Sequence, residues 1–289
     1  MKVGVLCFLS MALLASCEKP LLDEVSSKPK ETGNVTMEFS PYTHESFTRS
    51  SAVSEVFTRL NLMLFNTSND KVFTQVKTQT SDEEDFGTFS FNLGAGTYKV
   101  VAIGHSSSKS ATISSPEKVT FTLVDGRKIT DTFYYYGLIT ISDSVYTFNN
   151  VMKRGTAMFR LYLTDEALPD IVHAFKFTYT GGSADINPST GKGCTNSTQN
   201  ETIPVTDNNI YEVYTFPKAN EGKLKVTVSA LDENGDVIKQ RVFVDVPIIL
   251  NEITQYKGDF FTGDEANITV TTTGFTVDSE WNKTNEYTF

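Results

Sequence analysis

Apolar side chains recur at every second position in many short stretches of this chain. This alternation is typical of β-strands, whose successive side chains point to opposite faces of a sheet. Almost no stretch shows helical spacing over a dozen residues, and clusters of Gly, Asn, Asp and Ser separate the runs. We therefore predict an all-β fold. The predicted strands are 35–39, 56–65, 72–77, 88–93, 98–104, 119–123 and 133–141, then 156–163, 173–179, 211–216, 224–231, 237–246, 256–261, 268–273 and a terminal strand.

The terminal segment 273–289 carries the most regular pattern. All its aromatic residues lie at odd positions, and the even positions from 276 to 288 are polar. We interpret the segment as one extended strand with a single apolar row. This row either completes its own domain or fills a groove in a neighbouring subunit. It consists of Phe275, Val277, Trp281, Tyr287 and Phe289.

The number of runs indicates two domains. Seven or eight strands in each half are what a pair of β-sandwiches requires. The basic, glycine-containing stretch 151–155 is the predicted link, which gives predicted domains of 34–153 and 154–289. In the second domain, Asn234-Gly235 predicts a tight hairpin turn with positive φ angles. A calcium loop is disfavoured there, because the glycine directly follows Asn234 and no glutamate follows at EF-hand distance.

The first residues have the features of an export signal. Residues 1–16 show a short positive start, an apolar run too short to cross a bilayer, and small residues before a cysteine. Leu14-Ala15-Ser16-Cys17 resembles a bacterial lipobox, which implies cleavage before Cys17 and lipid attachment to it. The alternative is an ordinary secretory signal with a chance cysteine. The stretch 17–33 is rich in proline and charge, which predicts a flexible tether.

Composition narrows the possible classes further. With 39% apolar and 12% aromatic residues, the chain can build real cores. A formal charge of −10 supplies no basic face, so nucleic acid is not an expected partner. Once Cys7 is removed and Cys17 is acylated, Cys194 is the remaining cysteine, so the mature chain has no disulfide. We expect Cys194 to be an incidental loop thiol.

Patterns for catalysis or metal binding are weak. The histidines His44, His105 and His173 are widely spread, and no zinc-ligand spacing exists. Gly94-Ala-Gly96 leads into a strand, which favours a turn over a phosphate loop. The four acids at 82–85 are typical of a solvated loop, although two carboxylates brought together by folding can hydrolyse a sugar. We expect no enzyme activity, no metal and no cofactor.

Four further features accompany the lipobox, the tether and the two predicted β domains. They are Leu93-Gly-Ala-Gly-Thr-Tyr-Lys-Val-Val-Ala-Ile-Gly104, Val151-Met-Lys-Arg-Gly-Thr-Ala-Met-Phe-Arg-Leu161, Ile249-Leu-Asn-Glu-Ile-Thr-Gln-Tyr-Lys-Gly258 and the late Trp281. Together these features resemble the fimbrillin family of the Bacteroidales, the subunits and anchors of type V pili.

The resemblance implies two transthyretin-like sandwiches, no catalysis, and a lipoprotein of the outer membrane and cell surface. In that family an arginine-specific protease cuts the loop after the first strand, and a strand from another fimbrial subunit fills the groove that remains. Here 35–39 is the matching first strand, and the loop 40–52 contains Arg49. The alternative is an uncut arginine in an ordinary loop. Whether the chain is a stalk subunit or an anchor stays open, as do surface ligands on host or bacterial cells.

A second function of another class is a glycan-binding surface lipoprotein, in which tandem sandwiches present aromatic platforms to sugars. Tyr134-Tyr135-Tyr136 keeps this alternative open, while the single tryptophan disfavours it. Strand alternation predicts that Tyr135 and its two neighbours face opposite sides of a sheet.

Overall fold

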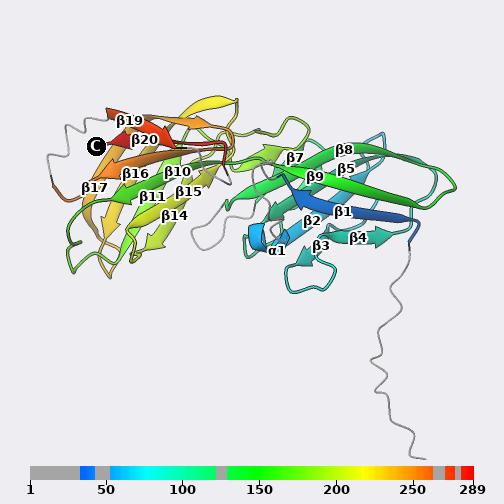
Figure 1. Cartoon of the computed structure of the whole chain (residues 1–289), viewed down its shortest axis with the longest axis horizontal. Helices are drawn as coiled ribbons and strands as arrows, with labels where there is room; N and C mark the ends of the chain where they lie inside the picture. Colours follow the sequence, from blue (N-terminus) through cyan, green and yellow to red (C-terminus); the bar gives the residue numbers. More distant parts are fainter. Residues whose placement is uncertain (1–32, 43–52, 122–128, 263–270, 277–280) are drawn as a thin grey trace, which may run out of the picture. The chain divides into compact units, whose positions relative to one another are not determined.

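Short strands make up almost all of the regular structure (Figure 1). The computed structural model describes residues 33–42, 53–121, 129–262, 271–276 and 281–289, with 271–276 described by their backbone alone. This part of the chain contains twenty strands and one helix of four residues, α1 (Val53–Val56). The predicted all-β fold is therefore confirmed.

The first half of the chain forms a sandwich of two layers. Its strands run in the order β3-β2-β5-β8-β9-β1-β4, and this order folds over between β8 and β9, where two residue pairs connect the layers. Apolar side chains of both layers meet in the core between them. The strands are β1 (Val35–Pro41), β2 (Arg59–Phe65), β3 (Lys77–Thr80), β4 (Thr88–Phe91), β5 (Gly96–His105), β8 (Thr132–Ile141) and β9 (Tyr146–Arg154).

The second half forms another sandwich with its own core. One sheet has the order β15-β10-β18-β20-β19, and the facing sheet has the order β14-β11-β16-β17. Inward-facing phenylalanine and tyrosine rings dominate this core, as the alternation of the sequence requires. The strands are β10 (Ala157–Leu163), β15 (Ile210–Thr215), β18 (Glu252–Gly258), β19 (Thr271–Thr276) and β20 (Lys283–Thr288), with β11 (Ala174–Thr180), β14 (Gln199–Pro204), β16 (Glu221–Leu231) and β17 (Val237–Ile249).

A small third sheet takes strands from both halves. Its members are β6 (Thr112–Ser115), β7 (Lys118–Thr120), β12 (Asp185–Asn187) and β13 (Lys192–Gly193), in the order β13-β12-β7-β6. It encloses a separate core, in which Val101 of β5, Val119 of β7 and Ile186 of β12 are fully buried. The second half therefore contributes to a core that lies against strands of the first half. The predicted division into domains 34–153 and 154–289 stays a prediction.

Several sequence interpretations need correction. Residues 72–76 of the predicted run 72–77 are not a strand, since they form a series of bends before β3 begins at Lys77. Residues 151–154 of the stretch predicted as a link are the end of β9, and Gly155 comes directly after that strand. A Cβ at Gly155 would lie 2.7 Å from Cδ1 of Ile186, so the glycine permits this close approach. The hairpin at 231–237 is confirmed between β16 and β17, with positive φ at Gly235 and not at Asn234.

The shared core yields a stability prediction. Ile186→Ala removes a fully buried side chain and leaves a cavity, so we expect the free energy of unfolding to fall by about 2–5 kcal/mol. The matched control is Val237→Ala, because Val237 is 57% exposed and its loss should change the stability by less than about 0.5 kcal/mol. Urea unfolding followed by fluorescence measures both. Equal effects of the two substitutions would contradict burial of Ile186 in a shared core.

Candidate functional site

The first strand lies in the middle of a layer. β1 pairs in parallel with β9 over seven residues, from Val35↔Tyr146 to Pro41↔Met152. On its other edge it pairs antiparallel with β4, from Val35↔Phe91 to Glu38↔Thr88. Within the part of the chain that the structure describes, the strand nearest to the N-terminus is therefore hydrogen-bonded on both sides.

The alternating sequence of β1 determines which face it buries. Val35 and Met37 are fully buried and Phe39 is 3% exposed, whereas Glu38 and Ser40 are exposed. The Phe39 ring makes edge contacts with Phe89 and Tyr135, with centroid distances of 6.2 and 5.9 Å. Burial of three such side chains contributes roughly 5–9 kcal/mol before the cost of ordering the strand.

Further hydrogen bonds secure both ends of β1. At the start, the side chain of Asn34 donates to the Leu93 carbonyl and accepts from the Leu93 N–H, both at 2.8 Å. At the end, the Tyr42 N–H donates to the Met152 carbonyl at 2.7 Å. The chain then enters the stretch 43–52, which contains Arg49. Arg49 and Cys17 both lie outside the described residues.

The C-terminal segment is a hairpin rather than one extended strand, so that interpretation was wrong. β19 and β20 pair antiparallel with each other, with Phe275 opposite Asn285. β20 also pairs in parallel with β18, from Glu252↔Lys283 to Lys257↔Thr288. β20 is therefore an inner strand of its own sheet, with partners on both edges.

The predicted apolar row is divided between two clusters. Trp281 is 5% exposed and packs against Met158, Ile253 and Tyr214 on one face of the sheet. Tyr287 stacks on Tyr256 at 5.0 Å, and Phe289 meets Phe243 at the same centroid distance, both in the core of the second sandwich.

The other two members of the predicted apolar row are Phe275 and Val277. The side chain of Phe275 and the whole of Val277 lie outside the described residues. The three members whose side chains are described all pack within this chain.

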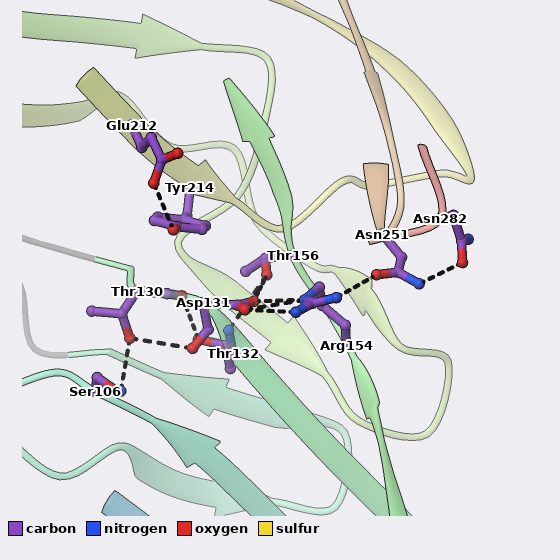
Figure 2. Close-up of polar contacts among 10 residues, drawn as sticks. All are labelled: Ser106, Thr130, Asp131, Thr132, Arg154, Thr156, Glu212, Tyr214, Asn251 and Asn282. Atoms are coloured by element: carbon purple, nitrogen blue, oxygen red, sulfur yellow. Dashed lines mark hydrogen bonds and ion pairs between the residues drawn. The ribbon is translucent and has the colours of Figure 1, made fainter. Parts of the chain in front are cut away.

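Arg154, the last residue of β9, connects the first sandwich to the start of the C-terminal strand β20, and Figure 2 shows its polar contacts. Nε of Arg154 donates to both Asp131 carboxylate oxygens at 2.9 and 3.1 Å, and Nη2 donates to Oδ2 at 2.9 Å. The guanidinium carbon lies 4.0 Å from the Trp281 ring centroid and 4.7 Å from that of Phe133. The charge is therefore paired in the guanidinium plane, and aromatic rings contact the group.

Two asparagines extend this network to the C-terminal hairpin. Nη1 of Arg154 donates to Oδ1 of Asn251 at 2.9 Å, and Nδ2 of Asn251 donates to Oδ1 of Asn282 at 2.9 Å. The Asn282 N–H also donates to the Asn251 carbonyl at 3.0 Å. Asn251 adopts φ 60°, a left-handed conformation that asparagine tolerates in turns.

The sequence predictions did not include this polar network. Arg154 stood in a stretch that was interpreted as a link. Asp131, Asn251 and Asn282 belong to no local motif, so folding alone brings them together.

No catalytic arrangement emerges from the described residues. Among them, no group of three or more His, Cys, Asp and Glu side chains is placed to hold a metal ion. No helix in the described part has the length and apolar character to span a membrane. Burial and the nearby Asp185 raise the pKa of the Cys194 thiol, so it is not an activated nucleophile.

The tyrosine triplet does not form an exposed platform. Tyr135 packs against the core of the first sandwich, and Tyr134 and Tyr136 pack against the core under the small sheet. The predicted alternation is confirmed, and all three side chains are partly buried. Burial raises the pKa of Tyr134 and Tyr135.

The described part of the chain defines a β-sandwich protein whose first described strand is an inner strand of its layer. Residues 22–287 match the family described as fimbrillin-A associated anchor proteins Mfa1 and Mfa2. The chain belongs to this family, and the resemblance to Bacteroidales fimbrillins is confirmed. Proteins of this family are structural components of fimbriae rather than enzymes.

Comparison with solved structures gives distant matches. The fimbrial anchor protein Mfa2 from Porphyromonas gingivalis is 12% identical with a TM-score of 0.39, covering 73% of this chain and 82% of that chain. A fimbrial assembly protein from Parabacteroides distasonis is 11% identical with a TM-score of 0.41, covering 78% and 90%. A candidate polysaccharide-binding protein from Bacteroides thetaiotaomicron is 9% identical with a TM-score of 0.49, covering 73% and 79%. No curated protein sequence matches the chain.

Tyr256 of β18, which lies opposite Tyr287 in the neighbouring strand β20, gives a pH prediction. Burial, with a contribution from Tyr287, raises its pKa from 10.0 to about 12. The folded state therefore favours the neutral phenol, and this contribution to stability is complete below pH 10 and is lost as the pH rises through 12. Tyr256→Phe retains the ring without the ionisable hydroxyl, so we expect the variant to lose less stability than the wild type over this window.

Urea midpoints at pH 8, 10 and 11 measure the difference. Tyr162→Phe is the control, because Tyr162 is half-buried on the opposite face of the sheet. Identical pH profiles for wild type and Tyr256→Phe would contradict the buried position of this hydroxyl.

Proposed function

We propose that this protein is a fimbrial subunit or anchor of the cell surface, held in the outer membrane by lipid on Cys17, that joins neighbouring subunits by β-strand exchange. Family membership supports the fimbrial role. The observation that carries the strand exchange is the position of β1, which among the described residues is the strand closest to the N-terminus and is also an inner strand of its layer.

Loss of β1 would create an acceptor groove. β9 and β4 would each lose a hydrogen-bonded neighbour, and the sites of Val35, Met37 and Phe39 would open to water. Such an edge is unstable until another strand covers it. A strand with apolar side chains at alternate positions, supplied by a neighbouring subunit, would restore both the backbone pairing and the core.

The stretch that carries Arg49 is well placed for processing. It follows the last residues of β1 and precedes α1, so a cut after Arg49 separates β1 and the lipid from the remaining chain. A stalk subunit would be cut there, and an anchor would keep both. The two roles are therefore distinguished by whether the protein recovered from cells contains or lacks residues 17–49.

The C-terminal row is the proposed donor for a neighbouring groove. Trp281, Tyr287 and Phe289 pack against other residues of this chain. Donation of this row to a neighbouring subunit therefore requires the hairpin of β19 and β20 to leave its sheet. The acceptor role of the β1 position requires the cut after Arg49 and then the departure of β1 from β4 and β9, with which it is paired. The glycan-binding alternative gains no support from Tyr134, Tyr135 and Tyr136, which pack against the two cores.

Proteolysis tests the exchange directly. Purified protein treated with an arginine-specific protease is expected to form oligomers that resist denaturant, because the inserted strand buries three large side chains. Arg49→Lys preserves the charge and removes the cleavage site, so this variant should stay monomeric. A variant without residues 275–289 should be cut but fail to polymerise with itself. Polymerisation of both variants like the parent would reject the exchange at these sites.

The lipid attachment makes a separate prediction. Cys17→Ser removes the thiol that would carry the lipid, so we expect the variant to move from the membrane fraction to the soluble fraction of cells. Cys194→Ser is the matched control and should leave the distribution unchanged. Membrane association of both variants at the parental level would contradict anchoring through Cys17.

A further inference from the structure

We infer that Arg154 is a positioning residue for the C-terminal strand: it latches β20 into its own sheet at the point where the first sandwich ends. The consequence for assembly rests on the proposed function, because a latched strand is not free to enter a neighbouring subunit. The latch itself consists of Arg154, Asp131, Asn251, Trp281 and Asn282, and it stands on the geometry alone. Figure 2 draws its four polar members, Asp131, Arg154, Asn251 and Asn282.

The chemistry of the latch depends on arginine. The planar guanidinium group donates to Asp131 along one edge and to Asn251 at another nitrogen, while its face meets the Trp281 ring. Lysine carries the same charge but offers neither the planar fork nor a flat surface for stacking. The Arg154 side chain is 5% exposed, so water competes weakly for these contacts.

The latch is located where the parallel ladder of β18 and β20 begins. The first pair of that ladder is Glu252↔Lys283, and Asn251 and Asn282 are the residues immediately before it on the two strands. The Asn282 N–H and the Asn282 side chain both bond to Asn251. Parallel strands begin at the same edge of a sheet. The cluster at this edge therefore fixes which residues of β18 and β20 pair first, and with that the register of the two strands.

The latch also connects β20 to the preceding sandwich. Arg154 ends β9, and Asp131 directly precedes β8. Thr156 donates to Asp131 Oδ1 at 3.0 Å, and the Asn251 N–H donates to the Thr156 carbonyl at 3.0 Å. The contacts that join this cluster to the C-terminal hairpin are those of Arg154 with Trp281 and of Asn251 with Asn282. Release of β20 therefore breaks these two contacts, while the bonds that hold the passage from β9 to β10 stay within the remaining chain.

Hydrogen exchange measured by mass spectrometry on the full chain tests the latch. In Arg154→Ala, amides of Thr284–Thr288 should exchange at least about tenfold faster than in the wild type, because a stacked and ion-paired contact is lost. Arg154→Lys should give an intermediate rate. The matched control is Arg160→Ala, which removes an arginine of the same sheet that pairs with Glu212 and does not contact the latch. Amides of β11 and β14 should keep their protection in every variant.

Two results would overturn the latch. One is unchanged exchange in β20 of Arg154→Ala. The other is an equal rise in all strands, which would show general destabilisation. If Arg154→Ala fails to fold, Asp131→Asn replaces it, because this change keeps the size of the side chain and removes its charge. The same acceleration confined to β20 is then expected.

A polymerisation assay separates the latch from the proposed function. Arg154→Ala is mixed with wild-type chain that has been cut after Arg49, and denaturant-resistant complexes are counted. A higher yield than with Arg160→Ala supports both the latch and donation of the C-terminal strand. Faster exchange in β20 without any complexes supports the latch and rejects the C-terminal strand as the donor.

Discussion

An inner β-strand must find hydrogen-bond partners on both of its edges, and in this protein that requirement falls on β1. β1 lies between β4 and β9, and the side chain of Asn150 in β9 donates to the carbonyl of Glu38 across 112 residues of sequence. The first sandwich is therefore complete only when its earliest strand meets its latest one. Contacts this distant in sequence form late, because closing a long loop costs entropy before the contacts compensate. The groove that β1 fills lies between β4 and β9, and both of these strands come later in the sequence. β1 is therefore a strand that another segment can replace once the groove has formed.

Period-two alternation in the sequence predicted β1 and most strands of the second half, because each buries one regular apolar face. It failed for β9, whose inward positions include Asn150 and Arg154. Buried polar groups break the apolar pattern, and they are tolerated only because folding supplies partners that a local window does not contain. The small strands β12 and β13 were missed for a related reason, since they are two or three residues long, β12 owes its pairing with β7 to the first half, and β13 pairs with β12 alone.

The terminal segment shows a different limit of sequence reasoning. Its odd-position aromatics alternate as one strand would, yet β19 and β20 run antiparallel to each other. Alternation reports which face a residue occupies within a strand and carries no information on whether the chain reverses. Asp278-Ser279 between the two strands is a pair typical of turns, and it was the available signal for a reversal. The latch residues gave no local signal at all, because Asp131, Arg154, Asn251 and Asn282 acquire their meaning only from their placement in space.

A polar latch suits a strand that has to stay in place and still be releasable. Taking Arg154 and Asp131 out of water carries a desolvation cost that largely offsets their mutual attraction, so the pair specifies an arrangement more than it stabilises one. When β20 leaves its sheet, Arg154 stays paired with Asp131, and the latch contacts that break are those of Arg154 with Trp281 and of Asn251 with Asn282. Exposure of Trp281 on opening is unfavourable, and its contacts with Met158 and Ile253 favour reclosure. In this combination the asparagines set the first residue pair between β18 and β20, and the Trp281 ring holds β20 in place. β20 can then leave its sheet when another subunit offers a better site for this ring and for the strand.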